Sequence, residues 1–262
     1  MGLFTMARSR FLVPGVIVIL GCSGALISAD EVTYFRQDNG VAADSSALTA
    51  NFGSESNLVW RVPLKSGISS PCVHGDRIFV TTFDKQTSEL ATVALDRTTG
   101  ATLWTKVVPT ERIEDVHQVG SPASCTPACD GKRVYSFFGS YGLLCHTMDG
   151  ELLWERQLGT GYGMPSISRG RLLHFDRQAD QAQLVCLHSE TGTLLWTFSY
   201  DTDYEDLYGY NNGPRCCPLI DGDRVYIYGA EGMLHCVRIT DGQLIWKVDT
   251  REQFGVVQNF FG

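Results

Sequence analysis

All five tryptophans of this 262-residue chain occur in one recurring sequence pattern. In four copies a glycine precedes the tryptophan by four positions, as in TGATLW at residues 99–104, and the fifth copy, NLVWRVPL, keeps the apolar approach without the glycine. The tryptophans and glycines are Trp60, Gly100/Trp104, Gly150/Trp154, Gly192/Trp196 and Gly242/Trp246. Successive tryptophans are 42 to 50 residues apart, which is the length of one four-stranded unit with its turns.

Three further landmarks recur inside each interval. In three intervals a proline is followed four residues later by a turn glycine, as in Pro71/Gly75 and Pro127/Gly131, and in the other the spacing is five, at Pro165/Gly170. An apolar strand follows, as in GDRIFV and GDRVYI. A second strand then ends in Thr-Gly or Asp-Gly, which are typical of tight hairpins. Helix-pair repeats would need apolar residues at a 3.6-residue period, which the chain lacks. The repeat therefore predicts an all-β fold built from the four-stranded antiparallel blades of a β-propeller.

The recurring tryptophan has a structural explanation in such a fold. A large flat side chain on the same strand of every blade can fill the wedge between neighbouring blades, and its burial removes about 200 Å² from water. We therefore expect the tryptophans and motif glycines to be structural, with no tryptophan left over for a ligand.

The repeat resembles the PQQ-like β-propeller family. Residues 94–104, ALDRTTGATLW, reproduce that family's blade motif A-x-D-x-x-T-G-x-x-x-W, and later copies replace the alanine by Cys186 and Cys236. The resemblance covers residues 55–262 and predicts four blades, at 68–107, 119–157, 161–199 and 213–248. The Trp60 strand would belong to a closing blade, and FGVVQNFFG at 254–262 would begin a fifth. Since the family's propellers have more blades, we expect a truncated copy, or a half-propeller completed by a second copy.

The N-terminus has the pattern of an export signal. Arg8 and Arg10 precede the apolar run FLVPGVIVIL at 11–20, which as a helix would be only about 15 Å long, too short for a membrane span. Small residues after this run predict a signal peptide over 1–29, followed by an extension over 30–54. The alternative is a lipoprotein signal ending at residue 21, with Cys22 lipidated. Either form predicts export to the periplasm or cell envelope, and lipidated Cys22 would add membrane attachment.

Charge and cysteine spacing exclude several classes. The chain has 21 basic and 29 acidic residues, a net charge of −8, and no basic run, which argues against nucleic-acid binding. The nine cysteines are not spaced like a disulfide framework, and no paired C-x-x-C motif predicts a zinc site.

The segment YDTDYEDLYGYNNGPR, at 200–215, is the candidate partner-binding loop. It connects the third and fourth predicted blades and contains four tyrosines, a residue type that gives rigid amphipathic contact area. His117 lies in a second candidate loop, ERIEDVHQVG at 111–120. The alternative is that both are ordinary surface loops packed on the next blade. The four tyrosines are Tyr200, Tyr204, Tyr208 and Tyr210.

The adjacent pair Cys216–Cys217 is the candidate for cofactor chemistry. Quinone-dependent dehydrogenases with similar propellers place a ring of two adjacent bonded cysteines against their cofactor, together with a free tryptophan, a calcium site and a catalytic aspartate. No such acidic set is recognisable in this sequence. We therefore predict no catalytic residue, no metal ligand and no cofactor, with PQQ and calcium as the alternative that the resemblance implies.

These observations favour an exported, non-catalytic β-propeller that binds a protein or polysaccharide partner through loops on one face. The resemblance includes the scaffold-type lipoprotein subunit of the outer-membrane barrel-assembly machinery. Two alternatives are a PQQ-dependent oxidoreductase and the extracellular sensor or ligand-binding portion of a longer protein.

Overall fold

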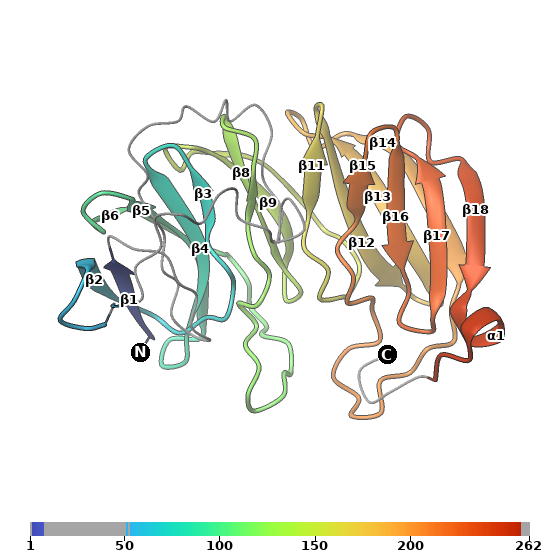
Figure 1. Ribbon diagram of the computed structural model, residues 1–262, viewed down its shortest axis with the longest axis horizontal. Helices are drawn as coiled ribbons and strands as arrows, with labels where there is room; N and C mark the ends of the chain where they lie inside the picture. Colours follow the sequence, from blue (N-terminus) through green and yellow to red (C-terminus); the bar gives the residue numbers. More distant parts are fainter. Residues whose placement is uncertain (1, 8–50, 52, 258–262) are drawn as a thin grey trace.

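The computed structural model describes residues 2–7, 51 and 53–257, and its main body consists of four four-stranded antiparallel sheets (Figure 1). The first blade contains β3 (Cys72–His74), β4 (Arg77–Asp84), β5 (Glu89–Asp96) and β6 (Thr102–Val107). The second contains β7 (Ala128–Cys129), β8 (Arg133–Phe138), β9 (Gly142–Thr147) and β10 (Leu152–Arg156). The third contains β11 (Ser166–Ser168), β12 (Arg171–Gln178), β13 (Gln181–His188) and β14 (Leu194–Asp201). The fourth contains β15 (Leu219–Asp221), β16 (Arg224–Tyr228), β17 (Met233–Arg238) and β18 (Leu244–Asp249).

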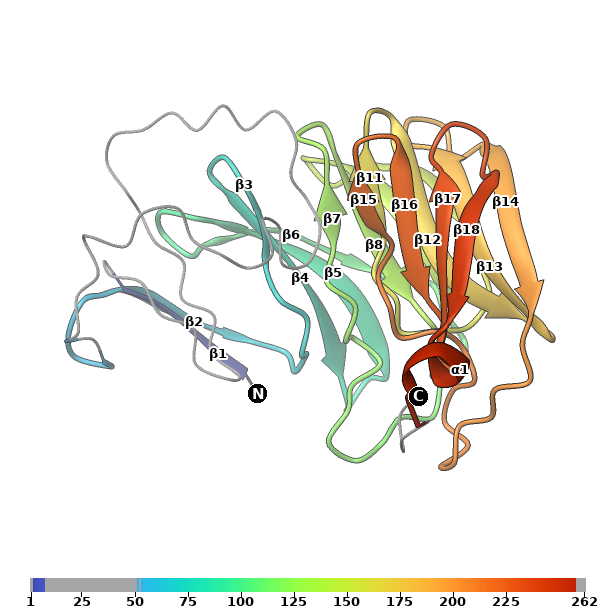
Figure 2. The same ribbon diagram turned by 45° about the vertical axis from the view of Figure 1, so that its right-hand side comes forward.

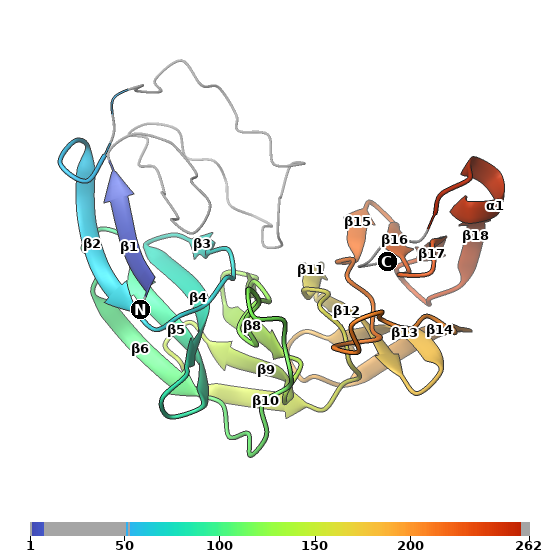
Figure 3. The same ribbon diagram turned by 90° about the horizontal axis from the view of Figure 1, so that it is seen from below.

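The blades stand side by side in an open arc, which is clearest from below (Figure 3). Each sheet pairs its strands in chain order, and the first strands of successive blades, β3, β7, β11 and β15, contact one another along the inside of the arc. The view in Figure 2 shows the later blades stacked face to face. The predicted all-β partial propeller is confirmed.

The four blades share one register. Trp104 pairs with Ala94 and Ala94 with Phe79, and the corresponding row in the third blade is Trp196, Cys186 and Leu173. Every blade has a register shift beside its tryptophan, which is the mark of a β-bulge. The bulge lets the outer strand bend at the same point in each repeat.

Four of the five motif tryptophans, all except Trp246, pack against the motif glycine of the next blade. A β-carbon added at Gly192 would lie 2.7 Å from the Trp154 ring, and one at Gly242 would lie 2.5 Å from the Trp196 ring. The indole nitrogen of Trp154 also donates a hydrogen bond of 3.1 Å to the Ser189 carbonyl. The same hydrogen bond joins Trp60 to the first blade, Trp104 to the second and Trp196 to the fourth. Both the ring and its N–H group therefore contact the following blade.

The hydrophobic core consists of layers that include residues from adjacent sheets. Between the second and third blades, Tyr135 and Phe137 pack with Leu172 and Leu187, all fully or almost fully buried. A comparable layer joins the third and fourth blades around Phe175 and Val225. Because each blade has little interior of its own, most of the apolar burial that stabilises the fold lies between sheets.

The two ends of the array differ from expectation. The Trp60 strand, β2 (Leu58–Leu64), pairs with β1 (Gly2–Ala7) from the N-terminus, and no C-terminal strand reaches it in the described parts of the chain. At the other end, where a strand was expected from residue 254, Phe254 ends the short helix α1 (Thr250–Phe254). Asp249 caps this helix by accepting from two backbone N–H groups, and Gly255 ends it in the left-handed conformation.

Apart from β1, the predicted signal peptide over 1–29 lies outside the described residues, and so does Cys22 with its predicted lipidation. Most of the 30–54 extension also lies outside them. Residues 258–262 do so too. Among the described residues, no helix has the length and apolarity needed to span a membrane.

Candidate functional site

The two loops that were expected to bind a partner lie next to each other, on one side of the arc. One is the connection from β6 to β7, and the other is the connection from β14 to β15, both at the lower edge in Figure 1. His117 of the first contacts Tyr210 of the second with ring centroids 5.8 Å apart, and Tyr208 at 6.4 Å. Tyr208 and Tyr210 are 6.4 Å from each other. We call His117, Tyr208 and Tyr210 the aromatic cluster.

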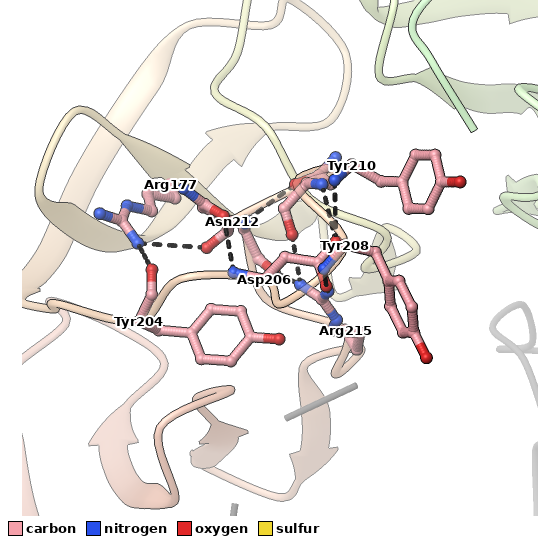
Figure 4. Close-up of polar contacts among 9 residues, drawn as sticks. Arg177, Tyr204, Asp206, Tyr208, Tyr210, Asn212 and Arg215 are labelled. Atoms are coloured by element: carbon pink, nitrogen blue, oxygen red, sulfur yellow. Dashed lines mark hydrogen bonds and ion pairs between the residues drawn. The ribbon is translucent and has the colours of Figure 1, made fainter. Parts of the chain in front are cut away.

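A buried carboxylate holds the tyrosine-bearing loop in shape. The side chain of Asp206 is almost fully buried and accepts backbone hydrogen bonds from Tyr208, Tyr210 and Asn211 at 3.0–3.4 Å (Figure 4). The backbone N–H of Asp206 in turn donates to the side-chain oxygen of Asn212, at 2.8 Å. Bonds of this kind favour a tight loop over an extended strand, because the carboxylate satisfies several N–H groups at once. As Figure 4 shows, the rings of Tyr208 and Tyr210 point away from this centre.

Two arginines anchor the same loop to the blades. Arg215 lies 3.8 Å from Asp206 as an ion pair, and its guanidinium stacks over the rings of Tyr204 and Tyr162 at 5.1 and 5.4 Å. Arg177, from β12, donates to the backbone carbonyls of Tyr204 and Asn212. A planar guanidinium with several donors suits this role, since it can bind several carbonyls while it stacks on a ring. These contacts therefore hold the loop near its start, at Tyr204, and near its end, at Asn212 and Arg215.

The structure corrects the expected set of surface tyrosines. Tyr204 is only 3% exposed, because it lies beneath Arg215. Tyr200 belongs to β14 and donates a hydrogen bond of 2.7 Å to Glu231, and burial together with this carboxylate raises its pKa. Both residues support the third and fourth blades: Tyr204 is buried and Tyr200 is half-buried with its hydroxyl bonded to Glu231. Tyr208, which is 53% exposed, and Tyr210 remain as candidates.

Exposed apolar and acidic side chains lie in the same two loops. Val119 and Leu207 are 78% and 69% exposed, above every large apolar residue on the blade strands, of which Val107 at 53% is the most exposed. Exposed acids accompany them in both loops: Glu111, Asp115, Asp203 and Glu205. The surface thus combines exposed apolar and aromatic groups with negative charge.

A half-buried glutamate lies in the β6–β7 loop. The backbone of Glu114 is held by a hydrogen bond of 3.0 Å to the Ser140 hydroxyl, and its carboxylate lies against Gly139. Burial raises the pKa of the Glu114 carboxyl to about 7. Sequence reasoning did not single out Glu114, Asp206 or Arg215. Only Asp206 had a local signal, its position among the tyrosines of the 200–215 segment.

The residues around Cys216 and Cys217 do not fit a bound quinone. Both thiols are free; the Cys216 sulfur lies 3.1 Å from the Cys217 carbonyl, and Cys217 accepts from the Met164 backbone at 3.3 Å. A β-carbon on Gly163 would lie 2.7 Å from the Cys216 carbonyl oxygen, so the 161–164 segment fills the space beside the pair. Within the described ranges, no three His, Cys, Asp or Glu residues are grouped to bind a metal ion.

Comparisons with solved structures agree with the fold. BamB from Moraxella catarrhalis is 19% identical with a TM-score of 0.51, over 74% of this chain and 56% of that one. A europium-containing methanol dehydrogenase is 13% identical with a TM-score of 0.55, over 72% and 42%. Quinohemoprotein alcohol dehydrogenase from Comamonas testosteroni is 15% identical with a TM-score of 0.52, over 71% and 35%. The chain thus spans between 35% and 56% of the length of these proteins.

No curated protein matches the chain. The family model described as outer membrane protein assembly factor BamB matches residues 27–171 and 181–258, which together make up more than half of the sequence. The match spans all four blades and their tryptophan–glycine contacts. The chain therefore belongs to the outer membrane protein assembly factor BamB family of PQQ-like propellers.

Proposed function

We propose that this protein is an exported, non-catalytic scaffold of the cell envelope that binds a protein partner through the aromatic cluster. The single observation that carries the proposal is that His117 meets Tyr208 and Tyr210 across two loops more than 80 residues apart in sequence. The membership in a family named for outer membrane protein assembly supports the cellular setting.

The rigidity of the site supports binding. A loop that is already held by Asp206, Arg177 and Arg215 loses little conformational freedom when a partner docks, and this raises affinity for a given contact area. Aromatic side chains with few rotatable bonds have the same advantage.

The chemistry of the surface indicates the kind of partner. Apolar side chains such as Leu207 and Val119 would contact apolar groups of the partner. The exposed acids of both loops would face basic ones, and such charge pairing mainly speeds association and selects the partner. We therefore expect a protein segment that carries aromatic or aliphatic residues next to lysine or arginine.

Site-specific photocrosslinking tests the proposal. A photoreactive amino acid replaces Tyr208 in the full-length protein, expressed in its own cells, and the matched control carries it at Leu195, which is 44% exposed on β14. We expect a discrete adduct from position 208 that contains tryptic peptides of a second protein, and none from position 195. Absence of an adduct at 208, or the same adduct at both positions, would refute the assignment. An adduct without peptides of a second protein would favour a glycan.

The oxidoreductase alternative needs its own test. The full-length protein is incubated with PQQ and calcium, and dye-linked dehydrogenase activity is measured with primary alcohols. Activity above that of a protein-free control would contradict the non-catalytic proposal, whereas the photocrosslinking result would remain valid.

A further inference from the structure

Two cysteines from different blades meet inside the protein. Cys72 begins β3 and Cys129 ends β7, and these are the innermost strands of the first and second blades. Their sulfur atoms are 3.2 Å apart, and the residues are 7% and 0% exposed. A disulfide needs a sulfur–sulfur distance of about 2.05 Å, so roughly 1 Å of movement separates the two thiols from a bond.

The surroundings would accept the bond. Cys72 and Cys129 belong to a closed apolar cluster with Phe79, Ala94 and Val134, against which Trp104 packs. Forming a disulfide removes two thiol hydrogens and leaves a smaller, apolar group. No polar partner has to be given up, because among the described residues the two thiols hydrogen-bond only to each other.

The remaining cysteines of the described ranges lack this arrangement. Cys125 faces the carbonyls of Tyr162 and Gly163 at 3.8 and 3.9 Å. Cys216 and Cys217 contact backbone groups, and the buried cysteines of the motif position lie in separate blades. A specific pair thus stands out from a set of free thiols.

We propose that Cys72 and Cys129 form a disulfide that joins the first blade to the second. Each thiol loses its proton, the two sulfur atoms bond, and two electrons reduce a disulfide-bearing oxidant to two thiols, through a mixed-disulfide intermediate. The cross-link closes a segment of 57 sequence positions and so restricts the unfolded chain. It forms as the blades dock, because both sulfurs are afterwards shielded from external reagents. The inference stands independently of partner binding.

Peptide mapping tests the bond. The full chain is refolded in a buffer of reduced and oxidised glutathione, trapped with N-ethylmaleimide under denaturing conditions and digested with trypsin without reductant. Cleavage after Lys65, Arg77, Arg112 and Lys132 places Cys72 in peptide 66–77 and Cys129 in peptide 113–132. We expect these two peptides to be linked, and the linked species to disappear on reduction.

Peptide 113–132 also contains Cys125, so variants are needed to identify the sulfur. The linked species should persist in Cys125→Ala and vanish in Cys129→Ala. Persistence in Cys129→Ala, or full alkylation of Cys72 and Cys129 in the oxidised wild type, would overturn the proposal.

A stability measurement covers the case in which a variant does not fold. The urea midpoint of the oxidised wild type should fall after reduction. The control variant Cys145→Ala, which removes a buried cysteine at another position, should show the same fall. An unchanged wild-type midpoint would contradict a cross-link between the blades.

Discussion

The motif tryptophan is covered at the three interfaces between consecutive blades, but it is more open to solvent on the outward face of the fourth blade. Trp104, Trp154 and Trp196 are half-buried and each donates its N–H group to the next blade. Trp246 occupies the same register position but is 37% exposed, and its ring packs against Tyr226 of its own blade. The motif therefore provides the same side chain everywhere, and stability comes from what the neighbouring blade adds to it.

The innermost strands follow the same contrast. The first strand of the fourth blade is more open than its counterparts, with Leu219 at 48%, whereas the apolar residues beside the tryptophan on the outer strand, such as Leu244 and Leu194, are similarly exposed in both settings. A blade in this array is thus well packed only where another blade covers its face.

The largest expected effect separates the two kinds of tryptophan. Trp154→Ala should destabilise the protein by about 3 kcal/mol or more, because it empties the wedge between the second and third blades and removes the hydrogen bond to Ser189. Trp246→Ala should cost at least about 1 kcal/mol less than this, since the residue is 37% exposed and no described blade covers its outward face. Urea unfolding of both variants measures the difference. Equal losses would show that the tryptophans act within their own blades.

The glycine that receives each tryptophan allows a matched pair of substitutions. Gly192 and Gly170 both have positive φ, 66° and 75°, but only Gly192 faces a tryptophan ring; Gly170 has no atom within 4 Å of an added β-carbon. Gly192→Ala should therefore destabilise the fold by about 2–3 kcal/mol, and Gly170→Ala by about 1 kcal/mol, the backbone cost alone. Thermal unfolding of the two variants gives the comparison, and similar losses would mean that the ring moves aside.

Acid should weaken an enclosed interface through one histidine. His174 is fully buried against Phe137, at 4.1 Å between ring centroids, and neither ring nitrogen has a hydrogen-bond partner. Burial lowers its pKa to about 3. Between that value and the ordinary pKa of about 6.5, only the unfolded state binds the proton. The stability that neutral, buried His174 contributes is therefore fully present above about pH 6.5. It is lost as the pH falls, by about 2 kcal/mol between pH 7 and 5.

The corresponding position of the fourth blade is the buried Ile227, which suggests His174→Ile as the variant. The unfolding free energy of the wild type minus that of the variant should decrease or change sign as the pH falls. Taking this difference removes the contribution of the titratable groups that both proteins share. Glu114 acts in the opposite direction: its raised pKa gives stability below about pH 4.5 that is lost as the pH rises through about 7. A pH-independent difference would show that His174 is protonated without cost.

Much of the fold could be predicted because the repeat is local. Each sheet lies within the expected blade or extends past it by only one or two residues, since hairpin turns at glycines such as Gly100 and Gly150 fix where strands begin and end. The helix α1 was missed, because its signal consists only of a cap at Asp249 and a glycine at Gly255. Such a short helix has no apolar periodicity to detect.

The candidate site was predicted only in part. The sequence identified both loops, but it treated four tyrosines alike, whereas Tyr204 is covered by Arg215 and Tyr200 is enclosed with Glu231. Exposure depends on how a loop folds onto the neighbouring blade, and residue type alone does not contain that information.

The sequence by itself determined the blade: its four strands, its turns and the position of its tryptophan, because these follow from spacing within about 45 residues. Only the tertiary structure decided which rings form the aromatic cluster and that Cys72 meets Cys129, since both depend on how separate sheets dock. Contacts across an interface are set by the packing of two surfaces, and no local pattern in either segment records its partner.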